Sequence, residues 1–287
     1  MIERRIDFLI VITAEKCNPN GDPLSGNAPR QDYDGYGEIS DVCLKRKIRN
    51  RMQDMGYSIL NQSNERSDDG FYSIKDRVNS CEEFKNTMSK KYKNIHEKVN
   101  DLREIACRAW MDVRCFGQVF PLKGGDDVSF PVRGPVSISF AKSIAPISFE
   151  QIQITKSLNL KTLESQTKDS TTMGMKYIID KGAYVVKGSI FPQLASLTRF
   201  SYDDAEIIHE CLKTLFENDA SASRPSGSIS VHRLYWWDYK DAKKIPSPMA
   251  AFRSVSFEPM EEYPFYTVKE DFIPECEPEI YIGDVYE

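Results

Sequence analysis

A short basic segment is the part of the sequence best suited to binding a polyanion. Five cationic residues occur within positions 45–51, and no acidic residue lies between them. On a helix, Lys45 and Arg49 are neighbours four residues apart, as are Lys47 and Arg51, so two ridges of like charge result. Such ridges gain free energy when nucleic-acid phosphates neutralise them and release counterions. The alternative interpretation is an ordinary solvated helix face.

A loop rich in Asn, Gly and Pro precedes this segment over residues 18–30. Asn18, Asn20 and Asp22 alternate as in a calcium-binding loop, but proline occupies the positions of the required glycine and bidentate glutamate. We therefore expect no calcium site. The glycines of the loop would let the backbone approach a ligand, and Arg30 at its end could reach a phosphate. An ordinary turn is the equal alternative.

Three acidic residues, Asp22, Asp32 and Asp34, could act as a general base or hold a metal ion. No histidine lies near them in the sequence, and acids in loops of this composition more often form Asx turns. The chain also lacks the sequence motifs of nucleotide-binding loops, nucleophile elbows and zinc metalloproteases. We expect no catalytic site, no bound metal and no cofactor.

The patterns around these residues predict the elements that position them. Residues 6–12 are apolar on both faces, which predicts a central strand of a sheet. Ser40 and Asp41 are of the types preferred at a helix N-cap and in the first turn. The helix that follows is expected to bury one face, formed by Leu44, Ile48 and Met52.

The elements in chain order predict an α+β fold. They give strand, helix, strand, strand, helix, strand, which is the ferredoxin-like order that RNA-recognition motifs share. Residues 56–97 are polar and form an insertion after the first helix. A second helix is expected over 97–115, followed by a strand over 136–140 with Val136, Ile138 and Phe140 buried. Residues 153–176 are expected to form an exposed, extended excursion. A strand over 183–190, a helix that begins with a capping box at Ser201–Asp204, and a last strand over 228–236 complete the series.

Charge is distributed unevenly along the 287 residues. The net charge is −5, but the stretch from Glu258 to Glu287 holds ten acidic residues and one lysine, so the rest of the chain is net positive at +4. The acidic stretch is punctuated by proline, and we expect it to be irregular. It is either a solvated extension or a segment that docks on a basic surface of a neighbouring copy. The aromatic run Tyr235–Trp237 favours core packing over base stacking.

Cysteine usage and hydropathy indicate a reduced, soluble, cytoplasmic protein. The seven cysteines are odd in number and form no Cys-x-x-Cys pair, which argues against a disulfide framework and a zinc ribbon. No apolar run approaches the roughly 18 residues that a membrane span needs. The N-terminus lacks the pattern of a signal peptide.

Six segments spread over most of the chain give the sequence a close resemblance to a known family. The chain resembles the CRISPR-associated backbone subunits of Cascade surveillance complexes, within the RAMP superfamily, and specifically the type I-C subfamily. The segments that carry this resemblance are Asn18–Pro23 with Pro29-Arg30, Ile39–Asn50, Asp112–Gly117, Arg133–Lys142, Thr172–Lys176 and Arg224–Ile229.

The resemblance implies a division of most of the chain into three parts. A modified RNA-recognition-motif palm would comprise residues 1–55, 98–150 and 177–240. A helical finger-like insertion would occupy 56–97 and a protruding thumb 151–176. The acidic, Pro-punctuated C-terminal extension, residues 241–287, departs from the family's pattern.

The resemblance also implies a function, a set of partners and contact residues. Copies would multimerise along a CRISPR guide RNA, hold its phosphates without reading its sequence, and present its bases for pairing with target DNA. The partners would be the guide RNA, target DNA, other copies of the chain and other Cascade subunits, with no membrane. The helix residues that would hold phosphates are Lys45, Arg46 and Arg49, and the thumb residues that would meet the guide are Met173 and Lys176; Arg30 joins them as a candidate from its position in the loop.

Two other functions stay open alongside this one. Related subunits cleave target RNA with a loop aspartate, so the chain could be a metal-dependent endonuclease that uses Asp22 or Asp32. It could also be a general single-stranded RNA-binding protein. Of these three functions, we expect the backbone subunit that binds the guide RNA, and we expect it not to be an enzyme.

Overall fold

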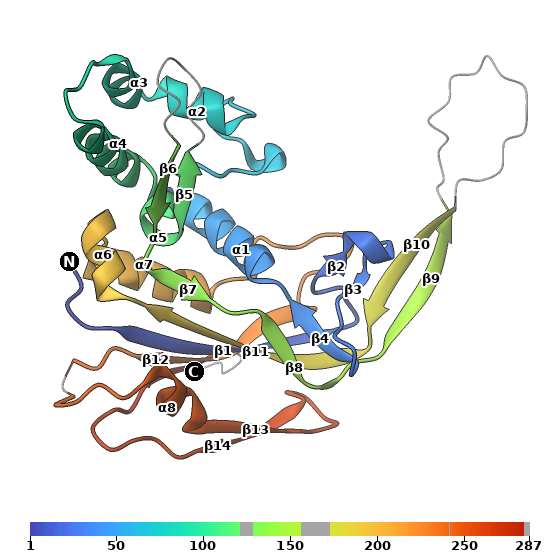
Figure 1. Ribbon diagram of the computed structural model, residues 1–287. Helices are drawn as coiled ribbons and strands as arrows, with labels where there is room; N and C mark the ends of the chain where they lie inside the picture. The colour runs from blue at the N-terminus through green and yellow to red at the C-terminus, as the bar shows by residue number, and fades with distance from the viewer. Residues whose placement is uncertain (121–128, 156–172, 241, 284–287) are drawn as a thin grey trace, which may run out of the picture.

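The computed structural model describes residues 1–120, 129–155, 173–240 and 242–283, and it combines helices and strands as expected (Figure 1). Its main sheet has the strand order β15-β12-β1-β11-β8-β4, and β7 also pairs with β11. Every neighbouring pair in this sheet is antiparallel. The strands are β1 (Ile6–Glu15), β4 (Tyr36–Ile39), β7 (Val136–Ile138), β8 (Ala141–Pro146), β11 (Lys181–Ile190), β12 (Ile229–Trp237) and β15 (Glu279–Ile282).

Strand β1 is central, as its apolar sequence predicts. It pairs with β11 on one side and β12 on the other. Phe8 and Ile10 pack into one hydrophobic core, whereas Leu9 and Val11 pack into a second. Both faces of the sheet are therefore covered.

Helices cover the first face. The helix α1 (Asp41–Asp54) begins at Ser40, whose side chain accepts a hydrogen bond from the backbone of Cys43, and its residues Leu44, Ile48 and Met52 are buried as expected. The helix α7 (Tyr202–Lys213) begins with the predicted capping box of Ser201 and Asp204. The short helix α6 (Pro192–Thr198) precedes it and was not expected from the sequence.

The C-terminal segment covers the second face, which corrects the expectation of an irregular extension. It contains α8 (Pro248–Arg253), β13 (Val255–Pro259) and β14 (Tyr266–Glu270), which lie below the sheet in Figure 1. The expectation was wrong because apolar residues stand between the acids and pack on the sheet. Val255 and Tyr266 share a core with Tyr235 and Trp237, and this core confirms the expected packing role of the aromatic run.

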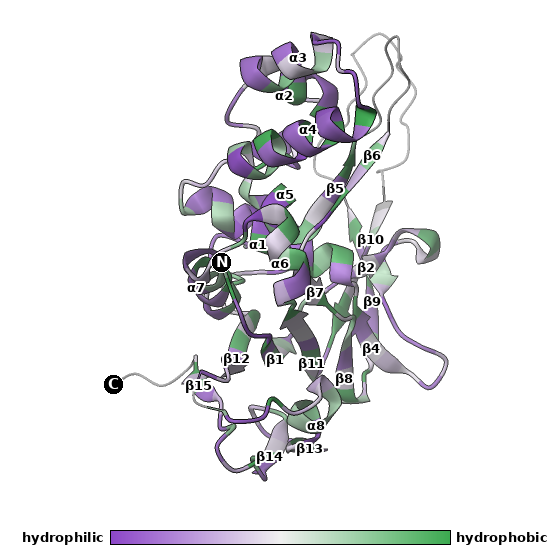
Figure 2. Ribbon diagram, turned by 60° about the vertical axis from the view of Figure 1, so that its left-hand side comes forward, coloured by the Kyte–Doolittle hydropathy of each residue, from purple (hydrophilic) through white to green (hydrophobic). Residues whose placement is uncertain are grey.

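The insertion packs together with the elements that follow it into a unit with a separate hydrophobic core, and hydrophilic residues line the outer sides of α3 and α4 (Figure 2). The predicted helix over 97–115 proves to be two helices, because Trp110 adopts an extended conformation with φ −128° and ψ 120°. Its indole is buried against Phe84 and fills the core at the break. The elements here are η2 (Asn64–Arg66), α2 (Ile74–Ser80), α3 (Glu82–Ser89), α4 (Ile95–Ala109), α5 (Met111–Phe116), β5 (Gly117–Phe120) and β6 (Phe130–Arg133).

A two-stranded hairpin projects from the body of the molecule (Figure 1). It consists of β9 (Phe149–Thr155), whose side chains are all exposed, and β10 (Met173–Ile179). The predicted thumb falls on this hairpin in part, and residues 156–172 lie outside the described residues. Phe140 is 52% exposed, contrary to expectation, because β7 ends at Ile138 and the alternation does not continue.

Candidate nucleic-acid interface

Three segments that are distant in the sequence meet at the N-terminus of α1. The side-chain oxygen of Asn20 accepts hydrogen bonds from the backbone (2.9 Å) and hydroxyl (3.0 Å) of Ser40, so the 18–30 loop is tied to the helix cap. The backbone N–H of Asn18 donates to the carbonyl of Ser223 at 2.8 Å, which joins the segment between α7 and β12. We call the meeting point of these segments the α1 junction.

The 18–30 loop is less irregular than its composition predicts. It contains two two-residue strands, β2 (Gly21–Asp22) and β3 (Ala28–Pro29), which pair with each other around the 3-10 turn η1 (Pro23–Ser25). Asp22 caps this turn by accepting from the backbone of Leu24. The loop is therefore a small ordered hairpin that holds its side chains in place.

Arg30 leaves this hairpin at the α1 junction. One of its terminal nitrogens lies 3.3 Å from Oδ1 of Asp22, and its side chain is about one-third exposed, at 32%. Partly exposed pairs of this kind are weak in water, on the order of 0.5 kcal/mol. Arg30 can therefore exchange its carboxylate for a phosphate at little cost.

The outward-facing cations of α1 are likewise held only by weak interactions. Nζ of Lys45 lies 2.9 Å from Asp41, one turn earlier, and the side chain is 26% exposed. Arg46 donates to the backbone carbonyl of Asn61 and has no ion pair among the described residues. Lys45 lies beside the helix cap at the α1 junction, whereas Arg46 faces the start of the insertion, and both side chains are partly exposed.

The inward-facing cations of α1 have partners that the neighbouring sequence does not reveal. Lys47 is 4% exposed and paired with Asp219, and burial lowers the pKa of its ammonium group while Asp219 opposes that shift. Nε of Arg49 lies 3.1 Å from the buried Asp112. The expectation of two uncompensated cationic ridges is thus wrong, since their acids come from parts of the chain 63 and 172 residues away.

Arg224 is a further cation of the α1 junction that the sequence analysis assigned no role. Its Nε lies 3.0 Å from Asp219, the carboxylate that Lys47 also uses. Arg30, Lys47 and Arg224 all act to lower the pKa of the Cys43 thiol, against the larger effect of burial. The Arg224–Ile229 segment was a signal for this residue, because it is one of those that carry the family resemblance.

The two thumb candidates lie on β10, away from α1. Met173 is opposite Thr155 and Lys176 is opposite Ile152 in the hairpin register. The base of the hairpin reaches the α1 junction, because the backbone N–H of Ile179 donates to the carbonyl of Cys17 at 2.8 Å. The structure thus groups Arg30 and Lys45 with the loop and helix cap, directs Arg46 toward the start of the insertion, and places Met173 and Lys176 on the hairpin.

The candidate catalytic acids have structural partners instead of a shared site. Oδ1 of Asp32 accepts hydrogen bonds from the backbones of Asp34 (3.0 Å) and Tyr36 (2.9 Å), as an Asx turn does. Lys142 lies 2.7 Å from Asp32 and holds the pKa of that carboxyl below its usual range. Among the described residues, no group of three or more His, Cys, Asp or Glu side chains could hold a metal ion.

All seven cysteines are free thiols. None of the described helices is both long and apolar enough to cross a bilayer.

Comparison with known proteins places the chain in a family. The sequence model of the family "CRISPR-associated protein Cas7" matches residues 4–272. The CRISPR-associated protein Cas7 of Haloferax volcanii is 33% identical over 172 residues, which are 58% of this chain and 47% of that protein. The matched region thus spans about half the length of this curated relative.

Two solved structures also match the chain, both at low sequence identity. One is a chain of a "CRISPR RNA-guided surveillance complex, pre-nicking". The two chains are 14% identical with a TM-score of 0.47, and the match covers 86% of this chain and 79% of that chain. The other is a chain of a "CRISPR RNA-guided surveillance complex". The two chains are 13% identical with a TM-score of 0.47, and the match covers 91% of this chain and 78% of that chain.

Proposed function

The chain belongs to the CRISPR-associated Cas7 family, and from that membership we propose that it is a backbone subunit of a type I-C Cascade surveillance complex. Several copies assemble along one guide RNA in the cytoplasm, together with other Cascade subunits. They hold the guide by its phosphates and leave its bases free to pair with target DNA. The observation that carries this proposal is the family match over residues 4–272.

The palm of this subunit is a modified RNA-recognition motif built from residues 1–55, 98–150 and 177–240. The antiparallel order β12-β1-β11-β8 supports this assignment, because it brings the first and last strands of the series side by side. Tyr235 and Trp237 are buried beneath the C-terminal segment, so bases do not stack on that face of the sheet. The guide instead follows the α1 junction.

Phosphates bind to partly exposed cations, Arg30 and Lys45 at the α1 junction and Arg46 beside them on α1. Their partners are a carboxylate that is about one-quarter exposed, at 26%, or a backbone carbonyl, which supports an exchange for a phosphate without loss of the fold. Arg49 contributes mainly by holding α1 in place through Asp112. Met173 and Lys176 of the thumb, residues 151–176, contact the guide farther along its path.

The finger-like insertion, residues 56–97, and the C-terminal segment, residues 241–287, complete the subunit without chemistry of their own. We infer that the chain is not an enzyme. The engagement of Asp22 in a turn cap and of Asp32 in an Asx turn and an ion pair supports this view over metal-dependent cleavage.

RNA binding and cleavage by the full-length chain test the proposal together. We expect the chain to bind single-stranded RNAs of unrelated sequence with similar affinity, and the affinity to fall steeply with salt concentration. We expect no cleavage of complementary RNA with magnesium or manganese. Cleavage that Asp22→Ala or Asp32→Ala abolishes would instead establish the endonuclease.

A further inference from the structure

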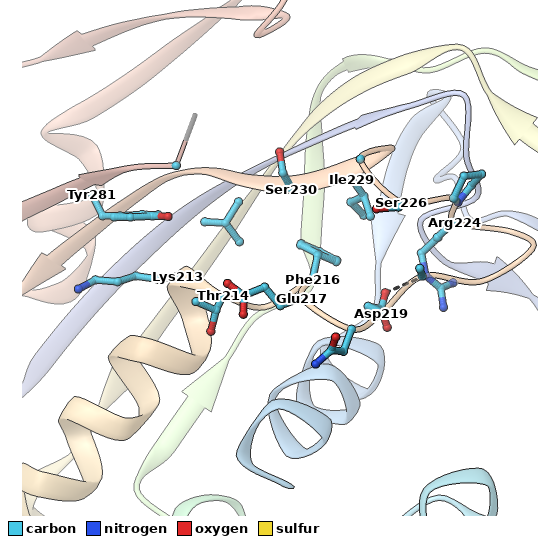
Figure 3. A pocket seen from close by; sticks show the side chains of 16 residues that line it. Lys213, Thr214, Phe216, Glu217, Asp219, Arg224, Ser226, Ile229, Ser230 and Tyr281 are labelled. Carbon is cyan, nitrogen blue, oxygen red and sulfur yellow. Dashed lines mark hydrogen bonds and ion pairs between the residues drawn. The ribbon is translucent and has the colours of Figure 1, made fainter. Parts of the chain in front are cut away.

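A pocket of about 350 Å³ opens beside the α1 junction and has no assigned role (Figure 3). It lies between the end of α7, the segment that leads to β12, and the strands β12 and β15. Arg224 is at one end, and Lys213 with Tyr281 is at the other, as Figure 3 shows. Phe216 lines the pocket between them.

The Arg224 end of the pocket carries an excess positive charge. Lys47 and Arg224 share the single carboxylate of Asp219, so this group of three has a net charge of +1. Only Nε of Arg224 is used in that pair, and its guanidinium has further donors. Ser226 and Gly227 border the same end and are exposed, which lets an anionic group approach.

Aromatic surface extends from the middle of the pocket to its opposite end. Phe216 lines the middle and Tyr281 the far end, and both are partly exposed. The ammonium group of Lys47 lies 5.2 Å from the centre of the Phe216 ring, and that of Lys213 lies 5.8 Å from the centre of the Tyr281 ring. Aromatic rings accept bases of any identity by stacking.

The acidic residue on the rim does not oppose an anion. Glu217 is paired with Arg51 at 2.7 Å, so its charge is compensated. Lys213 is paired with Glu210 at 2.8 Å, which leaves the excess positive charge at the Arg224 end alone. The pocket therefore has positive charge for a phosphate at the Arg224 end and aromatic surface for a base from its middle to the opposite end.

We propose that this pocket binds one nucleotide unit of single-stranded RNA, with its phosphate on Arg224 and its base against Phe216 and Tyr281. The proposal rests on the proposed function for the identity of the nucleic acid. It adds a contact for a base, whereas the α1 cations contact phosphates only. The contact does not read sequence, because stacking and charge recognise no base edge.

The test measures binding of a fluorescent oligouridine to the full-length chain. We expect Arg224→Gln to weaken binding and to lower the salt slope by about 0.7, the value for one phosphate contact on a single strand. The matched control is Arg108→Gln, which removes the same charge from the surface of α4, where Arg108 pairs with Glu83. An equal loss in both variants would overturn the proposal.

Tyr281 variants keep the test independent of the Asp219 pair. We expect Tyr281→Leu to weaken binding by about tenfold, the lower part of the range for one stacked base, and Tyr281→Phe to bind as the wild type does. We also expect a 4-thiouridine oligomer to crosslink to the peptide that contains Phe216 or Tyr281. Crosslinks confined to other peptides would contradict the proposal.

Different results would contradict the proposed function and the nucleotide pocket. A wild-type chain that binds no RNA would contradict the proposed function. A wild-type chain that binds RNA while Arg224→Gln and Tyr281→Leu match it would contradict the nucleotide pocket alone.

Discussion

Nε of Arg49 lies 3.1 Å from Oδ2 of Asp112, a carboxylate with no exposed surface. The same carboxylate accepts hydrogen bonds from the backbones of Leu60 at 2.8 Å and Asn61 at 3.1 Å. Asp112 therefore joins α1 to the start of the insertion and to α5. A charge that the sequence offers for RNA binding is used in part to hold the protein together.

Loss of the Asp112 carboxylate should destabilise the fold strongly. Asp112→Ala leaves Arg49 and the N–H of Leu60 without their acceptor, and we expect the free energy of unfolding to fall by about 3 kcal/mol or more. Urea denaturation measures this change. Asp34→Asn, in an exposed turn, is the control and should change stability little. A small effect of Asp112→Ala would show that the pair is not formed.

Substitutions of surface cations and of a buried cation around α1 should have different effects, the first on RNA binding and the second on stability. We expect Arg30→Ala combined with Lys45→Ala to weaken binding to every RNA sequence, to lower the salt slope by about 1.4, and to leave stability nearly unchanged. Arg49→Ala should instead lower stability, because it strips the buried Asp112 of its partner. Salt titrations and urea denaturation of each variant are the two readouts. Unchanged RNA affinity of the double variant would refute the α1 interface.

The C-terminal segment should unfold with the body of the protein. Tyr266 is 3% exposed, and we expect Tyr266→Ala to lower the free energy of unfolding by about 3 kcal/mol. Met260→Ala, at a residue that is 38% exposed in the same segment, is the control with a small expected effect. If both variants unfold as the wild type does, the segment is a solvated extension after all.

The ion pair between Lys142 and Asp32 should make a pH-dependent contribution to stability. Because the pair holds the pKa of Asp32 below its unfolded value, the unfolded chain takes up a proton first on acidification. The contribution is present at neutral pH and is lost as the pH falls through the lowered pKa. We expect Lys142→Met to lower the melting temperature slightly at pH 7, and we expect this difference to shrink as the pH falls below the ordinary pKa of an aspartate. A difference that stays constant on acidification would show another cause.

Four of the seven thiols should resist alkylation in the native protein. Burial raises the pKa of Cys107 to about 11 and that of Cys211 to about 12, and Cys17 and Cys115 are also buried with raised pKa values. The thiolate is the reacting form, so these residues should stay unmodified by iodoacetamide at pH 8 until urea unfolds the chain. Mass spectrometry of the peptides measures this. Rapid native modification of Cys115 would contradict the described core.

Local patterns in the sequence predict local structure correctly here. The cap at Ser40, the buried stripe of α1, the capping box at Ser201 and the central strand β1 all follow from neighbouring residues. These features depend on interactions within a few positions or on burial of a continuous apolar run. The predictions hold because tertiary packing agrees with local preference.

Features that depend on distant partners could not be predicted. Asp219 and Asp112 neutralise α1 from 172 and 63 residues away, and no pattern around residue 47 or 49 reveals them. The break at Trp110 is decided by the core of the insertion, which favours the buried indole over a continuous helix. The same reason applies to the C-terminal segment, whose few apolar residues matter only once the face of the sheet is known.

The most direct test of the proposed function is the mass of the complex that this chain forms in cells carrying its repeat array, with the bound RNA extracted and sequenced. We expect several copies of the chain on one RNA that carries repeat sequence at its ends. Bound RNA without repeat sequence, recovered from the same cells, would contradict it and would favour a general single-stranded RNA-binding protein.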